Sequence, residues 1–461
     1  MHHSEENRLN RFRVFKPLGL MTLGSLTPPE WQVTLIDENI AVPDYASSPI
    51  PDLVGITAFT SQAARAYELA AGFRQRGVAV VMGGIHASMC ADEAARHVDA
   101  VVRGEAEEIW KTVLDDAARG ALRPIYEGGF AAIEKVPPAR QDLASGGYLF
   151  GAIQVTRGCP LNCSFCSVTA FNGRQFRRRA IPDVVDEMRS IREKYILVVD
   201  DNLIGTSSHH MAYAKELFRA LIDARLDKRW ICQATVNLAE DEELLALAAR
   251  SGCRGVLIGF ESLSAEGLTE VNKKFNFKQQ RDIREVCRRI QRHGIAVLAN
   301  FIIGLDADKP GVGSQIAEAA IAAGVEMLHV QMLTPLPGTV LWNTLRAEDR
   351  IAANVFPDDW QYYTFTYPVA RCRHLSAADL VHEFTSCFRA FYSPPCILRR
   401  LLTSLFRSRG FVNTLVCLIA NLAYRGNLER ERRGLERYLA SAPRLARALP
   451  PSSPSPVTAP T

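Results

Sequence analysis

The 461-residue sequence has no apolar run long enough to cross a membrane. Its longest one, "FVNTLVCLIANLAY" at 411–424, has fourteen residues, whereas a membrane-spanning helix needs roughly 20. The start, "MHHSEENRLNRFRVF", is polar and basic, which disfavours a secretory signal peptide. The eleven cysteines include several lone ones in apolar surroundings, as is typical of reduced thiols. These features predict a cytoplasmic protein.

Acidic residues are scarce near the end of the chain. From Arg371 onward there are fourteen arginines, no lysine and five acidic residues, a net charge of +9, so residues 1–370 carry −5 of the total of +4. Such asymmetry is typical of a surface that meets nucleic acid or a membrane, although most charged runs are only solvated faces. Because residues 1–370 are net acidic and contain no recognisable RNA-binding module, we expect no nucleic-acid partner.

Residues 1–135 are predicted to form a doubly wound α/β domain. Short apolar runs alternate there with amphipathic helical patterns at 61–77 and 106–120, and a first helix falls within 11–31. The predicted strands are 31–38, 52–59, 78–84 and 99–105. This alternation predicts a parallel sheet that is covered on both faces and binds its ligand beyond the carboxyl ends of the strands.

A second β/α series is predicted over residues 145–345. Its six strands are expected at 151–158, 195–202, 229–237, 255–262, 296–304 and 327–333. Six strands with intervening helices fit a barrel or partial barrel, whose active site lies at the carboxyl ends of the strands. Residues 350–440 are predicted to be helical, and the Pro/Ser/Ala-rich segment 441–461 to be disordered.

Three cysteines lie close together in "TRGCPLNCSFCSV" (156–168): Cys159, Cys163 and Cys166. Three thiols on a short non-helical loop suit a metal centre better than a disulfide framework. A structural zinc site needs four protein ligands, but the chain has no second C-x-x-C or H-x-x-x-H. His209 and His210 could supply a fourth ligand, although adjacent histidines are more often surface residues. Three thiolates on a four-iron cluster leave one iron open for a small-molecule chelate.

This C-x3-C-x-aromatic-C spacing, with Phe165 at the aromatic position, resembles the signature of the radical S-adenosylmethionine (SAM) enzymes. The resemblance implies a [4Fe–4S] cluster on the three cysteines, SAM on the open iron, and an external electron donor of the flavodoxin or ferredoxin type. It also implies that Phe165 lies against the adenine, that Asp200 and Asp201 in "VVDDN" meet the SAM amine, and that Glu261 in "GFES" takes the ribose hydroxyls. Helix capping or a turn for Asp201 and Asn202, and a rim salt bridge for Glu261, are the structural alternatives.

The first domain resembles the cobalamin-binding domain of the B12-dependent radical SAM class. Three consecutive strand ends carry the resemblance, and the residues that it assigns to cobalamin are Thr57, Thr60, Ser61, Gly83, Gly84, Gly104 and Glu105. Glycines let the backbone approach a flat ligand, and short hydroxyls beside them can bind its edge. A glycine pair after a strand is also compatible with a simple turn.

Two features depart from that class. The D-x-H-x-x-G segment that supplies a histidine to cobalt in many such domains is absent, so we expect cobalt without a protein histidine. His86 is expected to be a loop histidine bonded to the backbone. The expected opening strand of the sheet is not visible either, so the start is truncated or "RFRVF" (11–15) forms it poorly.

Near the end of the chain stand "FPDDWQYYTFTYP" (356–368) and "LSAADLVHEFTSCFRAFYSPPCILRRLL" (375–402). They resemble the C-terminal extension of a subgroup that includes hopanoid C-2 methylase-like proteins. The apolar, arginine-flanked stretch 397–424 suits an interfacial helix, and equally a helix packed on the barrel. The combined resemblances imply methylation of an unactivated carbon of a small, lipidic molecule. A cobalamin-dependent radical cyclase, oxidase or rearrangement enzyme is the alternative, and a metal-containing RNA-binding protein a distant one. The sequence identifies no catalytic acid or base.

Overall fold

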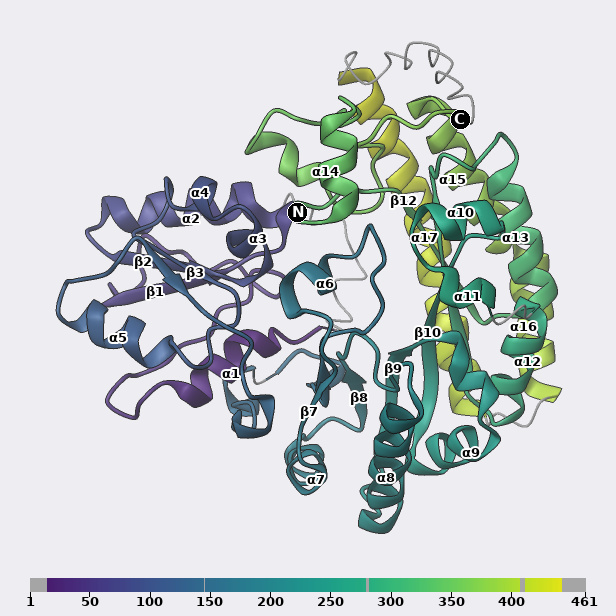
Figure 1. Cartoon of the computed structure of the whole chain (residues 1–461), viewed down its shortest axis with the longest axis horizontal. Coiled ribbons are helices and arrows are strands. Elements are labelled where there is room, and N and C mark those ends of the chain that lie inside the picture. The colour runs from purple at the N-terminus through teal and green to yellow at the C-terminus, as the bar shows by residue number, and fades with distance from the viewer. Residues whose placement is uncertain (1–14, 145, 279–281, 407–410, 442–461) are drawn as a thin grey trace, which may run out of the picture.

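The structure is a computed structural model that describes residues 15–144, 146–278, 282–406 and 411–441. Figure 1 shows a smaller α/β unit, in purple and blue, beside a larger one in teal. Helices of the C-terminal part, in green and yellow, pack against the larger unit. The architecture is therefore mixed α/β with two parallel sheets, as the sequence predicts.

The first sheet has four parallel strands in the order β1-β2-β3-β4. They are β1 (Leu53–Thr57), β2 (Ala79–Gly83), β3 (Ala100–Arg103) and β4 (Ile125–Glu127). Val80 lies on one face of the sheet and packs against residues of α2 (Ala63–Gln75). Val81 lies on the other face and packs against residues of α5 (Trp110–Ala118). Because both faces are covered, each strand is a nearly continuous apolar run. The other helices here are α1 (Leu18–Leu26), η2 (Thr60–Gln62), α3 (Gly84–Met89) and α4 (Ala91–Ala94).

The prediction of a strand at 31–38 is wrong. Within the described residues this segment forms no strand, and β1 pairs only with β2. A strand needs a hydrogen-bonding neighbour, so an apolar alternating pattern alone does not make one. The poorly formed opening strand expected at 11–15 falls, apart from Phe15, outside the described residues.

The second sheet has six parallel strands in the order β12-β11-β10-β9-β8-β5. The strands are β5 (Phe150–Ile153), β8 (Tyr195–Val198), β9 (Arg229–Ala234), β10 (Cys253–Glu261), β11 (Ala296–Ile303) and β12 (Met327–Met332). Each predicted strand is present, and consecutive strands are neighbours. In the part of the chain that the structure describes, β5 and β12 do not pair with each other, which makes the barrel partial. A short antiparallel hairpin, β6 (Thr156–Arg157) and β7 (Arg177–Arg178), interrupts the series after β5.

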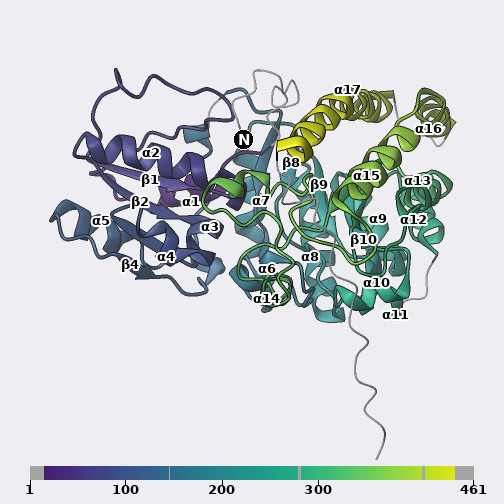
Figure 2. The ribbon, with the colours of Figure 1, turned by 90° about the horizontal axis from the view of Figure 1, so that it is seen from above.

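Helices cover the outer face of this sheet, and helices of the C-terminal part contact its last strand, β12. Figure 2 shows these C-terminal helices, in green and yellow, along one side of the larger unit. The helices of the barrel are α6 (Ser167–Asn172), α7 (Ile181–Ser190), α8 (Ser208–Ala224), η5 (Val236–Glu240), α9 (Glu242–Ser251), α10 (Ala265–Glu270), α11 (Lys274–Lys278), α12 (Ile283–Arg292), α13 (Val312–Ala323) and α14 (Val340–Ala347). They are followed by η6 (Asp358–Tyr362), α15 (Ala377–Phe391), α16 (Pro394–Phe406) and α17 (Phe411–Ser441). Among the described residues, no helix has both the length and the apolar character needed to cross a membrane. The tail predicted to be disordered lies, from 442 onward, outside the described residues.

One apolar core joins all three regions. We call it the shared core; its members come from the first sheet and its helices, from the rim of the barrel and from residues 351–370. Met82 of β2, Leu333 beyond β12, Trp342 of α14 and Trp360 of η6 all belong to it. Trp360 stacks on Phe356, with ring centroids 3.7 Å apart. The two sheets are thus held together by buried side chains rather than by a linker alone.

Candidate functional site

The three cysteines lie in the loop between β6 and α6, directly after β5, as the barrel rule predicts. All three are half-buried free thiols. Gly158 enters the loop with φ of +87°, and a Cβ atom there would lie 2.3 Å from the Gln175 carbonyl oxygen. Only glycine fits this position without moving the chain. The Cys159 N–H donates to the Gly173 carbonyl (3.3 Å), which ties the loop to the strand that returns as β7.

The chemistry of the three thiols suits iron better than a single zinc ion. Burial raises the pKa of Cys163 to about 11 and that of Cys166 to about 12, and metal ligation removes such protons. Among the described side chains, no three of His, Cys, Asp or Glu are grouped to share one ion. A four-iron cluster holds its thiolates farther apart than one zinc ion does. His210 stacks on Phe176 at 4.2 Å and His209 is exposed, so neither histidine is arranged as a fourth ligand.

Residues between the cysteines anchor the loop. The Ser164 N–H donates to the Val271 carbonyl (3.0 Å), and the Leu341 N–H donates to the Ser164 carbonyl (2.8 Å). Phe165 is half-buried and packs against the shared core. The loop therefore has a defined conformation before any cofactor is considered, and the adenine contact of Phe165 stays a prediction.

Asp200 is committed to the protein backbone. It is fully buried, and its two oxygens accept the N–H groups of Val155 (2.7 Å) and Thr156 (2.6 Å) and the Thr156 hydroxyl (2.7 Å). Burial raises the pKa of Asp200 to about 7 in spite of these hydrogen bonds. Asp200 thus holds the chain just before the cysteine loop, and the geometry favours Asp201 over Asp200 for the expected SAM contact.

Asp201 and Asn202 lie beside the thiols. Asp201 is half-buried, accepts from the Asn172 amide (3.1 Å), and contributes to the raised pKa of Cys159 and Cys166, for which burial is the largest cause. Asn202 is 1% exposed, and its amide nitrogen has no hydrogen-bond partner in the described structure. That amide lies near enough to Cys159 that it acts to lower the pKa of the Cys159 thiol. An unsatisfied buried donor beside a thiol fits a site that receives a further group.

Glu261 forms a buried ion pair, as its structural alternative predicts, with a partner, Lys273, that the sequence did not identify. Its φ is +66°, a left-handed conformation that is uncommon outside glycine and over-represented at functional sites. Lys273 Nζ lies 2.5 Å from Glu261 Oε1, and the Asn300 amide donates to Oε2 (3.1 Å). Burial acts to lower the pKa of Lys273, but Glu261 and the nearby Cys163 and Cys166 outweigh it and raise that pKa. Lys273 therefore brings a positive charge to the cysteine loop.

Replacing Lys273 by methionine should destabilise the chain, because it leaves the buried Glu261 carboxylate without its cation. We expect a loss of about 3–5 kcal/mol in the free energy of unfolding, measured by urea denaturation of the full chain. Lys274→Met is the matched control, since Lys274 is exposed and should change stability by less than about 0.5 kcal/mol. Equal urea midpoints for the two variants would contradict the role assigned to the buried pair.

Alternate residues of β11 and β12 face the inside of the barrel. Leu328, Val330 and Met332 pack outward with the covering helices, so His329 and Gln331 lie on the inner face. Asn300 is the register neighbour of His329. The side-chain oxygen Oδ1 of Asn300 is buried and unpartnered, and among the described residues neither the His329 ring nor the Gln331 amide makes a side-chain hydrogen bond. Burial lowers the pKa of His329 to about 4, so its ring is neutral at pH 7.

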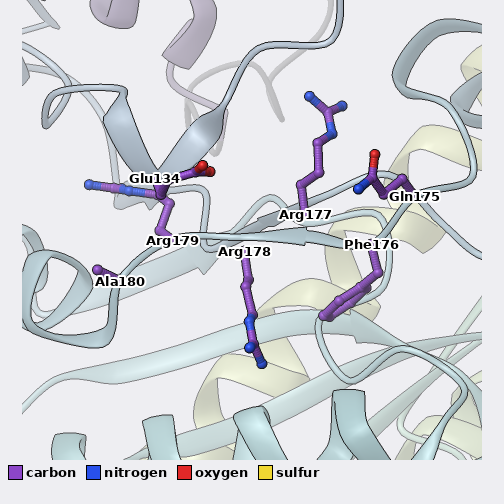
Figure 3. Close-up of a pocket in the computed structure, with 7 residues that line it drawn as sticks. All are labelled: Glu134, Gln175, Phe176, Arg177, Arg178, Arg179 and Ala180. Atoms are coloured by element: carbon purple, nitrogen blue, oxygen red, sulfur yellow. The ribbon is translucent and has the colours of Figure 1, made fainter.

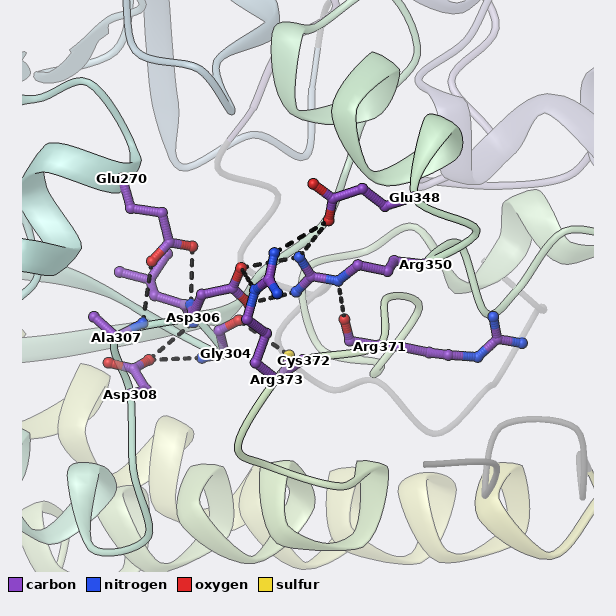
Figure 4. A network of polar contacts seen from close by, with 11 residues as sticks. Glu270, Gly304, Asp306, Ala307, Asp308, Glu348, Arg350, Arg371, Cys372 and Arg373 are labelled. Atoms are coloured by element: carbon purple, nitrogen blue, oxygen red, sulfur yellow. Dashed lines mark hydrogen bonds and ion pairs between the residues drawn. The ribbon is translucent and has the colours of Figure 1, made fainter. Parts of the chain in front are cut away.

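A polar network supports the cysteine loop from the C-terminal side (Figure 4). Glu270 accepts the N–H groups of Asp306 (2.9 Å) and Ala307 (3.2 Å), and the Glu270 carbonyl accepts from the Ser164 hydroxyl (3.4 Å). Asp306 pairs in turn with Arg350 and, at 2.8 Å, with Arg373. The segment around 350–373 is thus connected to the residue between two of the cysteines.

The carboxyl edge of the first sheet carries a tight glycine turn and free hydroxyls. Gly84 has φ of +85°, and a Cβ atom on it would lie 2.3 Å from Thr57 Oγ1. Thr57 is exposed and Ser61 half-buried, and neither hydroxyl has a partner in the described part of the chain. Gly83 ends β2, while Thr60 is largely buried. Exposed Thr57, half-buried Ser61 and the bare Gly84 backbone are what a flat ligand edge requires.

The two residues that follow β3, Gly104 and Glu105, make contacts in different directions. Gly104 has φ of +84°, and its N–H donates to Ser88 Oγ (2.9 Å), which itself donates to the Gly84 carbonyl (2.8 Å). Ser88, which the sequence did not single out, therefore joins the two glycine turns. Glu105 instead turns toward the barrel and pairs with Arg157 and Arg177. This geometry does not favour the expected contact of Glu105 with cobalamin.

His86 is fully buried below this edge. Its Nε2 forms a hydrogen bond with the Tyr67 hydroxyl (2.9 Å), which donates to Glu93 (3.0 Å); the Trp360 indole also donates to Glu93 (2.9 Å). The expected backbone hydrogen bond of the ring is not observed; the ring instead takes part in a side-chain network with the C-terminal part. A buried ring in this setting is poorly placed to ligate cobalt.

Comparison with known families agrees with both halves of this arrangement. Residues 11–114 match the B12 binding domain, and residues 153–309 match the Radical SAM superfamily. The chain is a cobalamin-binding radical SAM protein. Its cofactors are accordingly a [4Fe–4S] cluster, SAM and cobalamin, and the thiols, the unsatisfied Asn202 amide and the Gly84 turn with its free hydroxyls fit these groups.

The similarity to known relatives extends over most of this radical SAM protein. It is 29% identical over 418 residues to a bacteriochlorophyllide d C-12(1)-methyltransferase of Chlorobaculum tepidum, covering 87% of this chain and 88% of that one. It is 26% identical to a hopanoid C-2 methylase of Rhodopseudomonas palustris, covering 83% and 72%. The solved structure of TsrM from Kitasatospora setae, a radical SAM methyltransferase with cobalamin and a [4Fe–4S] cluster bound, superposes with a TM-score of 0.60 at 20% identity, covering 74% and 76%.

Proposed function

We propose that the protein is an enzyme that methylates an unactivated carbon of a small, hydrophobic molecule. The cluster with SAM would supply a 5′-deoxyadenosyl radical that removes a hydrogen atom, and cobalamin would supply the methyl group. An external one-electron donor of the flavodoxin or ferredoxin type is part of the proposal. The names of the bacteriochlorophyllide d and hopanoid relatives support methyl transfer to carbon.

The facing carboxyl ends of the two sheets carry this proposal. Helix α3, which starts at the glycine pair, lies against α6, which starts at the last cluster cysteine. A Cβ atom on Gly338, beyond β12, would lie 2.2 Å from Met89 Sδ at the end of α3. Both proposed cofactor sites therefore face one joint, where a substrate carbon can be reached from each side.

The inner face of the barrel suits the proposed substrate. Leu257, Leu298 and Met327 are register neighbours and form an apolar row. One step toward the mouth, Asn300 and His329 offer hydrogen bonds without a free charge. Such a wall would accept an apolar body with a neutral polar group.

Turnover with methyl-deuterated SAM tests the function. The reconstituted protein is incubated anaerobically, with a reductant, with extract from a strain that lacks the gene. We expect one labelled product together with 5′-deoxyadenosine and S-adenosylhomocysteine, because one SAM supplies the methyl group and another the radical. 5′-Deoxyadenosine without labelled product or S-adenosylhomocysteine would favour a cyclase, oxidase or rearrangement enzyme.

The finer parts of the proposal concern the regions of the chain. We assign cobalamin binding to residues 1–135, the radical SAM core to 145–345 and a helical extension to 350–440.

Leu398 and Leu402 are 57% and 47% exposed, one turn apart on α16, which supports a peripheral lipid contact. The other face of this extension packs inward, since Tyr392 stacks on Tyr424 (5.3 Å).

A further inference from the structure

A buried carboxylate joins the first sheet to the cysteine loop. Glu105 directly follows Gly104 at the end of β3 and is 4% exposed. Its Oε1 pairs with Arg177 (2.5 Å), and its Oε2 pairs with Arg157 (2.9 Å) and also accepts the Ala131 N–H (2.8 Å). Both arginines belong to the β6–β7 hairpin of the barrel, so a single side chain bridges the two units.

The charges in this contact are balanced and shielded from water. Glu107 adds a second carboxylate to Arg157 (2.7 Å), and all four side chains are at most 12% exposed. Burial acts to raise the pKa of Glu105, but Arg177 and Arg157 outweigh it and hold that pKa below its usual value. Glu105 is therefore ionised, and removing its charge would leave two buried arginines poorly compensated.

The β6–β7 strand pair connects this contact directly to the proposed cluster ligands. Arg157 is two residues before Cys159, and Arg177 also donates to the Asn172 carbonyl (2.9 Å) at the end of α6. Figure 3 shows Arg177 and Arg178 leaving β7 in opposite directions, beside the open hollow that residues 175–180 line with Glu134. Arg177 can thus serve the contact with Glu105, while Arg178 lies over the Tyr213 ring (5.1 Å).

We propose that Glu105 is a positioning residue that sets the distance and orientation between the cobalamin edge of the first sheet and the cluster loop. It acts through Arg157 and Arg177 and touches neither cofactor. On its own side it is anchored through Gly104 and Ser88 to the Gly84 turn, so the contact runs from one proposed cofactor site to the other. This inference rests on the cofactors of the proposed function.

The magnetic coupling between cob(II)alamin and the reduced cluster tests it in the reconstituted full chain. Dipolar coupling falls with the cube of the distance, so a displaced loop changes it even where both cofactors stay bound. We expect Glu105→Gln and Arg177→Lys to shift or broaden the coupling at wild-type cofactor content. Glu127→Gln is the matched control, because Glu127 pairs with Arg103 on the neighbouring strands at the surface. Unchanged coupling in both variants, or loss of cobalamin alone from Glu105→Gln, would overturn the proposal.

Hydrogen exchange of the cofactor-free chain gives a second test that does not depend on the proposed function. Glu105→Gln should speed amide exchange over 156–178 by at least about tenfold, because the hairpin loses its buried counter-charge. The control Glu127→Gln should leave these amides unchanged. Equal exchange in the two variants would overturn the positioning role even if a cofactor were absent. A wild-type chain that binds no cobalamin would instead contradict the proposed function.

Discussion

Alanine at Cys159, Cys163 and Cys166 together is expected to abolish cluster binding. Among the described side chains no three of His, Cys, Asp or Glu are grouped around one ion, so no ready substitute ligand set is at hand. Iron should fall to background after anaerobic reconstitution, and the thiolate-to-iron absorbance near roughly 400 nm should vanish. Cleavage of SAM to 5′-deoxyadenosine should be lost with it.

Cys396→Ala is the control for this triple variant. Cys396 is a half-buried free thiol on α16, outside the loop, and its removal should leave iron content and absorbance unchanged. Circular dichroism should show the same helix content in both proteins. A triple variant that still carries a full iron load would refute the assignment of the three ligands.

Tryptophan at Gly84 is expected to abolish cobalamin retention. The position has φ of +85°, and even a Cβ atom would collide with Thr57 Oγ1, so a large side chain must displace Thr57 and distort the turn beyond β2. The cluster lies in a separate loop and should remain. The variant should therefore still form 5′-deoxyadenosine but yield no methylated product, which separates radical formation from methyl transfer.

Gly72→Trp provides the matched control in the same unit. Gly72 is exposed on α2, and a Cβ atom there meets nothing within 4 Å. Cobalamin content after gel filtration should match the wild type for Gly72→Trp and fall to background for Gly84→Trp. Equal cobalamin in both would place the cofactor elsewhere. In the wild type, nitrogen hyperfine coupling from a protein imidazole in the cob(II)alamin spectrum would contradict the expected absence of a histidine ligand.

Most of the fold could be predicted because parallel strands covered on both faces are short apolar runs. Val80, Val81 and Met82, for example, are all buried, whichever face they point to. The same rule failed at 31–38, whose apolar pattern is present without a described neighbour to pair with. It also missed β6 and β7, because two-residue strands leave no periodic pattern to detect.

The sequence by itself determined which three cysteines we propose as cluster ligands, because a thiol spacing within eight residues is a local property of the chain. Glycines at sharp turns, such as Gly84 and Gly158, could be found for the same reason. Only the tertiary structure decided the roles of Glu105, Lys273 and Asp200. Glu105 meets Arg177 from 72 residues away, and Lys273 meets Glu261 across a helix. The free energy of a buried charge depends on the partner that the fold brings to it, and no local pattern records that partner.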